Sequence, residues 1–239
     1  METKLNAQIS PSLHPQVITS IKGYEQHKIL TGKADEAFAF AYDAVQTVVN
    51  HMEELRTDDL KTDKAKTQVL AEIANDSLQQ IMQKFALHER ILNESMTTIQ
   101  QQLTAPLETQ GKDGTLNAEI RAHMKSLTAD ERRVMLERAI RSSDLTTCAA
   151  VLCAPAYLSG IDEKQQNIYL AQYHQAGSPE VVEKLNVLGK VNEVVKRTIP
   201  IAQNELNGLA AKLANQLNSD KSSAAILDDK DRAVPYQRA

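Results

Sequence analysis

The feature that most constrains the fold is a long stretch without helix-breaking residues. Neither proline nor glycine occurs between Leu60 and Thr104. The stretch carries mostly apolar residues at alternating spacings of three and four, a pattern that we call a seam and that is typical of a helix packed along another helix. Its members are Ala74, Leu78, Ile81, Phe85, His88, Leu92, Ser95, Ile99 and Leu103. Such a helix is about 65 Å long, whereas a compact chain of 239 residues has a diameter of about 45 Å. We therefore expect an elongated molecule, or one that belongs to an assembly.

Two further seams flank this stretch. The first consists of Ala34, Phe38, Ala41, Val45, Val48, Met52 and Leu55. The second consists of Leu185, Leu188, Asn192, Val195, Ile199, Ala202, Leu206, Leu209 and Leu213. Ser178, Pro179 and Glu180 precede the second seam and are typical of a helix start: a capping residue, a proline in the first turn and an acid at the positive end of the dipole. Pro200 should kink the helix that follows, because its ring clashes with the carbonyl of Lys196.

These patterns predict an all-α fold, namely an elongated helical bundle with long antiparallel coiled-coil-like helices and a cluster of short helices. Aromatic residues make up 4% of the chain, and only 8 glycines and 7 prolines occur, which suits long helices better than sheets. The expected segments are an N-terminal arm with a short helix (1–32), a long helical hairpin (33–108), a short-helix cluster (109–177), a long kinked helix packed on the hairpin (178–218) and a mobile polar tail (219–239).

Local signals refine this division. Residues 16–29 read as the short helix of the arm, and residues 105–115, with one proline and two glycines, read as the clearest loop. Thr128 and Glu131 fit a capping box that opens a further short helix. Either Ser143 or Asp144 can cap the helix after it.

The two cysteines, Cys148 and Cys153, lie in that next helix and suggest packing rather than chemistry. Their spacing is not the CxxC of redox motifs, and residues five apart lie about 140° around a helix axis. Free cysteine behaves as a small apolar residue. Pro155 should end the helix, with Tyr157 and Leu158 folding back onto the core.

Two polar residues stand on the seams. A histidine in such a position, here His88, is usually a core residue whose hydrogen bonds are satisfied, although it can also sense pH. A buried seam asparagine, here Asn192, commonly fixes helix register or oligomeric state.

A basic cluster occupies the region 121–141. Its members are Arg121, Lys125, Arg132, Arg133, Arg138 and Arg141, interleaved with Asp130, Glu131 and Glu137. Nucleic-acid binding favours a basic face without acids and, for single strands, stacking aromatic residues, which this region lacks. A surface of ion pairs is the favoured interpretation, and contact with an acidic protein partner stays open.

No enzymatic motif stands out. The chain has no glycine-rich phosphate loop, no serine elbow, no zinc signature and no Glu-x-x-His pair of the kind that diiron bundles use. We therefore expect a non-enzymatic protein without cofactor or metal. No stretch approaches the roughly 20 apolar residues of a membrane span, and two cysteines do not form a disulfide framework. These features predict a cytoplasmic protein that does not bind membranes.

One block of the sequence resembles a segment found in other proteins. The segment LTADERRVMLERAIRSSDLTTCAAVLCAPAYLSGIDEKQQNIYLAQYHQ, residues 127–175, resembles part of the poorly characterised helical proteins of bacteriophages and prophages. The matching features are an acid- and arginine-rich helix, a capped short helix, an Ala-Pro-aromatic-Leu-Ser-Gly end and a second polar helix. The resemblance supplies no catalytic residues. It implies a phage setting, in the host cytoplasm or the virion, as a virion component, an assembly factor or a host-directed factor.

The expected function is therefore that of a structural or assembly protein acting through helix–helix contacts, as a phage virion or morphogenesis component. Its partners would be other copies of the chain or other phage proteins. The expected contact residues on the seams are Phe38, Val45, Met52, Phe85, His88, Leu92, Leu188, Asn192 and Leu206. The alternative is a nucleic-acid or host-protein binding module, which would use Arg132, Arg133 and Arg138 of the basic region.

Overall fold

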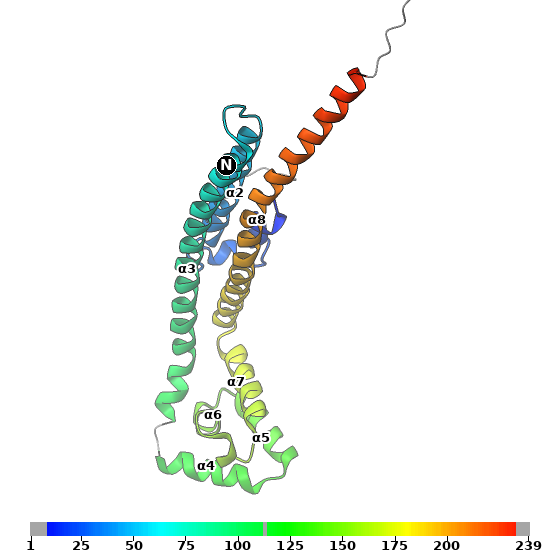
Figure 1. Cartoon of the computed structure of the whole chain (residues 1–239). Helices are drawn as coiled ribbons and strands as arrows, with labels where there is room; N and C mark the ends of the chain where they lie inside the picture. The colour runs from blue at the N-terminus through cyan, green and yellow to red at the C-terminus, as the bar shows by residue number, and fades with distance from the viewer. Residues whose placement is uncertain (1–8, 112–113, 233–239) are drawn as a thin grey trace, which may run out of the picture. The chain divides into compact units, whose positions relative to one another are not determined.

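The computed structural model describes residues 9–111 and 114–232, the last ten by their backbone alone, and every regular element in these ranges is helical (Figure 1). The all-α prediction is confirmed for this part of the chain. The α-helices are α1 (Gln16–Thr19), α2 (Ala34–Arg56), α3 (Asp63–Gln110), α4 (Gly114–Ser126), α5 (Ala129–Arg141), α6 (Leu145–Leu152), α7 (Glu163–Gly177) and α8 (Pro179–Arg232). Three short 3-10 helices accompany them: η1 (Pro11–Leu13), η2 (Glu25–His27) and η3 (Ala156–Leu158).

The chain forms two compact units. Unit 1 combines the chain up to Leu92 with the chain from Lys190 onward, and unit 2 is Asn93–Gly189. Both α3 and α8 therefore contribute to both units. The expected hairpin segment and the expected long C-terminal helix likewise each contribute residues to both.

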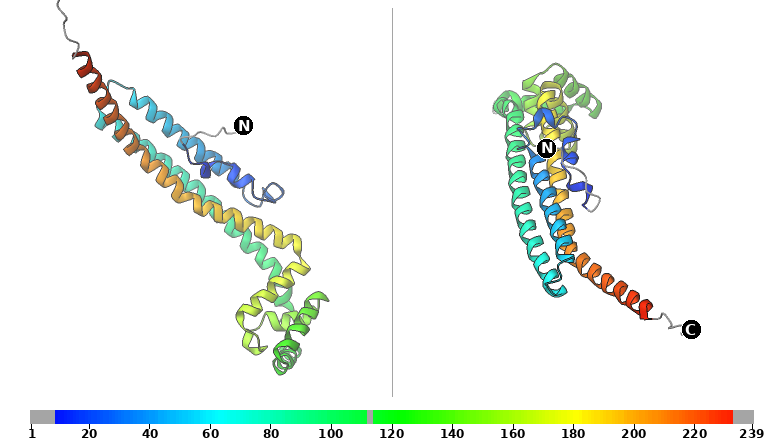
Figure 2. Two further views of the ribbon diagram at one scale, coloured as in Figure 1. Left: turned by 90° about the vertical axis from the view of Figure 1, so that its right-hand side faces the viewer. Right: turned by 90° about the horizontal axis from the view of Figure 1, so that it is seen from above.

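Unit 1 is built on three long helical segments that lie side by side (Figures 1 and 2). A short turn joins α2 to α3, so these two helices are antiparallel. Arg56 at the end of α2 forms a salt bridge of 3.1 Å with Asp220, and Lys196 forms one of 3.4 Å with Glu89. These two contacts show that α8 is antiparallel to α3 and parallel to α2. We call α2, residues 63–92 of α3 and residues 190–221 of α8 the three-helix body.

The core of unit 1 follows from the seams. The buried residues of α2 form a stripe wider than the seam alone: Ala34, Ala37, Phe38, Ala41, Tyr42, Val45, Val48, Val49, Met52 and Leu55. The seams of α3 and α8 supply the other two sides of this core. Each fully buried large apolar side chain contributes about 1.5–3 kcal/mol, so tertiary packing rather than intrinsic propensity holds these helices.

The N-terminal arm, residues 9–33, is less regular than the sequence suggests. The single helix expected over 16–29 is wrong: α1 ends at Thr19, and only the 3-10 turn η2 follows. Gly23 adopts a positive φ of 87°, which interrupts a right-handed helix. The arm still packs firmly, because Leu13, Ile18 and Tyr24 are each 0% exposed.

Unit 2 surrounds the shortest of its α-helices. Of the eight residues of α6, the six from Thr147 to Leu152 are buried. The helices α4, α5 and α7 pack against it. The core residues are Leu107, Met124, Leu136, Ala139, Ile140, Cys148, Ala149, Val151, Leu152, Ala156 and Ile161.

Capping defines where the short helices of unit 2 begin. The predicted capping box of Thr128 and Glu131 is present at α5, and Asp144 caps α6 by accepting from the backbone N–H of Thr147. A second capping box, between Asp162 and Gln165, opens α7. Such caps satisfy backbone donors that the first helical turn leaves open.

The loop expected at 105–115 is mostly helix. The helix α3 continues through Pro106 and ends at Gln110. Leu107 is 0% exposed within the core of unit 2, and the backbone N–H of Gly111 donates to its carbonyl at 2.8 Å. Burial of Leu107 offsets the loss of the one backbone hydrogen bond that Pro106 cannot make.

The C-terminal tail expected at 219–239 also begins as helix. The helix α8 starts after Ser178, as predicted, and runs through Pro200 to Arg232. Residues 219–232 therefore extend the helix, and residues 233–239 lie outside the described part of the chain. The kink expected at Pro200 stays a prediction.

The end of α6 corrects another expectation. Cys148 is buried as predicted, but Cys153 is exposed, so only one of the two cysteines packs in the core. The helix ends at Leu152, before Pro155, which precedes η3. Tyr157 is 69% exposed and Leu158 37%, so neither side chain folds back onto the core.

Candidate partner-binding surfaces

The seam residues that we expected to contact partners are nearly all enclosed within the chain. The buried members are Phe38, Val45, Met52, Phe85, Leu92, Leu188, Asn192 and Leu206. The structure brings Phe38 and Phe85 into an edge-to-face contact with ring centroids 5.2 Å apart. A partner could reach these side chains only if the elements that cover them moved aside.

His88 differs from the other seam residues. Its Nδ1 is buried without a hydrogen-bond partner, so the expectation of a satisfied core histidine is wrong for this atom. An added Cβ at Gly32 would lie 3.5 Å from Nδ1, which places the end of the arm directly over the ring. Burial, reinforced by the charge of Lys84, lowers the pKa of His88, while Glu36 and Asp35 act in the opposite direction.

A polar cluster beside His88 joins the arm to α2. The Tyr24 hydroxyl donates to Asp35 at 2.6 Å and accepts from the backbone N–H of Asp35 at 2.9 Å, and Lys28 Nζ donates to the same carboxylate at 2.5 Å. Burial raises the pKa of the Asp35 carboxyl, but the hydrogen bonds from Lys28 and Tyr24 outweigh it and hold that pKa below its usual value. Burial, followed by the bond to Asp35, raises the pKa of Tyr24.

Sequence reasoning missed this cluster. It treated residues 16–29 as one regular helix, whereas the break at Gly23 separates α1 from the turn that carries Lys28. The signal that could have found it is the position of Asp35 in the first turn of α2, beside a Thr-Gly break. A carboxylate there is stabilised by the positive end of the helix dipole.

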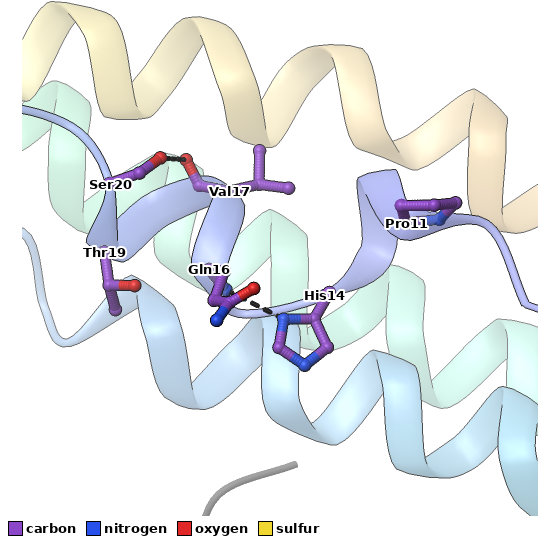
Figure 3. Close-up of a pocket in the computed structure, with 6 residues that line it drawn as sticks. All are labelled: Pro11, His14, Gln16, Val17, Thr19 and Ser20. Atoms are coloured by element: carbon purple, nitrogen blue, oxygen red, sulfur yellow. Dashed lines mark hydrogen bonds between the residues drawn. The ribbon is translucent and has the colours of Figure 1, made fainter. Parts of the chain in front are cut away.

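The arm also carries a shallow hollow of about 540 Å³ (Figure 3). Its lining residues are Pro11, His14, Gln16, Val17, Thr19 and Ser20. His14 Nδ1 accepts from the backbone N–H of Gln16 at 3.2 Å, and its ring meets Tyr42 edge-on with centroids 5.2 Å apart. In Figure 3 the Val17 side chain points toward the ribbon of α8, so the walls of the hollow also hold the arm in place.

The arginines of the basic region serve mainly local contacts. Arg132 donates to the carbonyls of Leu127 at 2.8 Å and Lys125 at 3.4 Å, which satisfies acceptors at the end of α4. Its guanidinium also lies against Gly160, where an added Cβ would be 3.0 Å from Nη1. Arg132 thus ties α4, α5 and the segment before α7 together.

Arg133 and Arg138 do not join Arg132 in one basic face. Arg133 forms ion pairs with Glu137 at 3.3 Å and with Asp130 at 3.9 Å, and Arg138 is exposed. Arg132 and Arg133 both line a hollow of about 280 Å³ that Asp130 and Tyr169 share. Burial and the nearby charge of Glu137 raise the pKa of Tyr169, and Arg133 opposes them. The hollow therefore mixes both signs of charge.

The structure also bears on whether the cysteines serve packing or chemistry and on whether a metal ion could be held. Burial, followed by the charge of Asp144, raises the pKa of the Cys148 thiol to about 12, which suits a packing role. Within residues 9–111 and 114–222, no group of three or more histidine, cysteine, aspartate and glutamate side chains is placed to hold a metal ion.

Comparison with protein-family models, with curated proteins and with solved structures finds no match to this chain. Among the described residues, no helix combines the length and the apolar character that crossing a bilayer requires.

Proposed function

We propose that this chain is a non-enzymatic structural or assembly protein that acts through helix–helix contacts with further copies of itself or with other proteins of a phage particle. The observation that carries the proposal is the position of the end of α8. Asp220 and Lys221 contact Arg56 and Asp63, which flank the turn between α2 and α3.

The helical backbone of residues 222–232 therefore continues past that turn (Figures 1 and 2). Within unit 1, neither α2 nor α3 accompanies this stretch. Most helical stability in proteins comes from tertiary packing rather than from intrinsic propensity. A helix from another chain is the simplest way to stabilise this extension, and it would follow the same packing rules as the three-helix body.

The phage setting rests on the resemblance of residues 127–175 to helical phage and prophage proteins. The features behind that resemblance are structural: the capping box of α5, the capped α6 and the Gly160 turn before α7. They support a common architecture for this segment, and the assembly role is our extension of it.

The test compares the full chain with a variant that ends at Lys221. Light scattering coupled to size exclusion should give a defined oligomer for the full chain and a smaller species for the truncated one, each with the same helical content per residue. A monomeric full chain at every concentration would exclude self-association, and absence from phage particles as well would contradict the proposal as a whole. Co-sedimentation of the chain with purified phage particles would then test the phage setting separately.

The alternative function, a nucleic-acid or host-protein binding module, has less support. Arg132 is occupied by the carbonyls of α4, and Arg133 is paired with Glu137. Charge reversal of Arg138, which is exposed, should leave nucleic-acid retention at low salt unchanged if our proposal is correct. A binding constant that falls steeply with salt and with this reversal would favour the alternative instead.

A further inference from the structure

The junction between the arm and α2 has the geometry of a hinge. Gly32 and Lys33 adopt successive left-handed conformations, with φ of 62° and 55°. Lys33 precedes α2 without any side-chain cap, so the first turn of this helix relies on the arm and on its own acids. Two neighbouring residues in this region can absorb a large change of chain direction.

The hinge is held from one side by α3. A Cβ added at Gly32 would lie 3.0 Å from Ile91 Cγ2 and 3.5 Å from His88 Nδ1, so both side chains lie beside the backbone there. Because His88 Nδ1 is buried without a hydrogen-bond partner, this contact is suited to an uncharged, unprotonated nitrogen.

A proton on His88 Nδ1 would add a buried positive charge and a donor without an acceptor. The carboxylates that face the ring are Asp35 and Glu36 of α2, and both are already engaged: Asp35 by Lys28 and Tyr24, Glu36 by Lys33. On its own helix, Lys84 adds a further positive charge. From α8, Lys196 binds Glu89, the neighbour of His88 in sequence.

We propose that His88 and the Gly32–Lys33 hinge form an acid-sensitive latch, which holds the arm on the three-helix body and loosens when His88 is protonated. A protonated ring would draw Asp35 or Glu36 toward it, because these are the carboxylates that face it. A pull on Asp35 competes with the cluster that joins the arm to α2, and a pull on Glu36 competes with its ion pair to Lys33 at the hinge. The arm then opens more often about Gly32 and Lys33, which supply the pivot.

Release of the arm would uncover surfaces of α2 and α8. The side chains that the arm buries there include Ile9, Leu13 and Ile18, and the backbone N–H of Ser10 bonds Glu205 of α8 at 3.1 Å. The use of these surfaces for a further helix rests on the proposed function, whereas the latch itself does not. Acid would thus regulate access to the helix–helix contacts.

Hydrogen–deuterium exchange of the full chain tests the latch. Between about pH 7.5 and about pH 5.5, which spans the ordinary histidine pKa of about 6.5, the exchange of arm amides should rise several-fold after correction for intrinsic rates. Amides in the middle of α2 should change far less. In His88→Leu, the arm should stay protected across this range.

A buried histidine of the arm itself, His14, provides the matched control. His14→Gln removes an imidazole from the arm itself but leaves His88 in place, so this variant should retain the pH response. His88→Gln, which is neutral and polar, repeats the test if His88→Leu fails to fold. A wild-type arm without a pH response, or His88 variants that respond like the wild type, would overturn the latch. Neither result bears on the oligomer expected from α8.

Discussion

The two units are both helical, but different interactions hold them. In unit 1 the helices are long and share continuous seams, and α2 begins at Ala34 without a side-chain cap. In unit 2 the helices α4 to α7 are short, and α5, α6 and α7 begin with side-chain caps. Long helices gain their stability from a long packed face, whereas short ones depend on satisfying their ends.

Side chains in unit 2 also satisfy backbone carbonyls, just as the caps satisfy backbone N–H groups at the helix starts. Gln166 Nε2 donates to the carbonyls of Val151, Leu152 and Ala154 at 2.7–3.1 Å, and Arg121 donates to the carbonyl of Ala150 at 3.4 Å. Together with Arg132 at the end of α4, these side chains close helix ends in unit 2. In unit 1 the turn between α2 and α3 is closed in a similar way, because Thr62 accepts from the backbone N–H of Ala65 and Lys66 donates to the carbonyl of Arg56. The units still differ in the length of the face that each helix packs. The difference predicts different responses to mutation.

The largest effect is expected from the aromatic contact in unit 1. Phe38→Ala should lower the free energy of unfolding of unit 1 by about 3–5 kcal/mol, because a fully buried ring leaves a cavity against Phe85. Native-state hydrogen exchange of α2 and α6 amides reads the two units separately. Phe40→Ala is the control, since that half-buried ring contacts Lys84 and should cost under about 1 kcal/mol. Equal losses of unfolding free energy in the two variants would show that buried seam contacts do not dominate the stability of unit 1.

Two glycines, one in each unit, should give the next largest effects on stability. Gly160 has a φ of 72° and lies against Arg132, so Gly160→Ala should destabilise unit 2 by about 1–2 kcal/mol. Gly208 lies inside α8 with no atom within 4 Å of an added Cβ, so Gly208→Ala should stabilise unit 1 by about 0.5–1 kcal/mol. Denaturant unfolding followed by circular dichroism measures both. Changes of the same sign in the unfolding free energy of the two variants would contradict the opposite roles given to Gly160 and Gly208.

Removal of a cap should have a smaller effect. Asp144 accepts from the backbone N–H of Thr147 at 3.1 Å and from its hydroxyl at 2.7 Å, so Asp144→Ala should cost about 1 kcal/mol in unit 2. The matched control is Asp130→Ala, whose side chain is 94% exposed and should change stability by less than about 0.5 kcal/mol. Exchange of α6 amides measures both. A loss no larger than that of the control would mean that packing, and not capping, holds α6.

The smallest effect concerns the half-buried His174 of unit 2. Burial lowers its pKa in the folded state, so the unfolded chain binds the proton more readily. The stability that neutral His174 contributes is complete above the unfolded pKa of about 6.5 and is lost as pH falls toward the lower folded value. His174→Gln should remove this slope, as followed by unit 2 exchange against pH. A slope unchanged in the variant would assign the effect to other groups.

Sequence patterns predicted the features that repeat or that follow capping rules. The seams of α2, α3 and α8, the start of α8 after Ser178 and the capping box at Thr128 all have local signatures. The contact of Phe38 with Phe85 follows from two seams packing together, although no pattern states which residues meet.

The missed features depend on contacts between residues far apart in the sequence. Pro106 is tolerated because Leu107 reaches the core of unit 2, and no local signal shows that core. The open Nδ1 of His88 depends on the backbone of Gly32, more than fifty positions earlier in the chain. Tyr157 is exposed because Ala156 takes the buried place in η3 that we expected larger neighbours to fill.

The order of the two units along the chain has a consequence for synthesis on the ribosome. Unit 2 is one continuous segment, Asn93–Gly189, whereas unit 1 needs residues from both sides of it. The inserted unit can therefore complete its core while the ribosome is still making α8. Until the segment after Lys190 emerges, the seams of α2 and α3 lack their third wall, and this interval exposes the nascent chain to association with neighbouring chains.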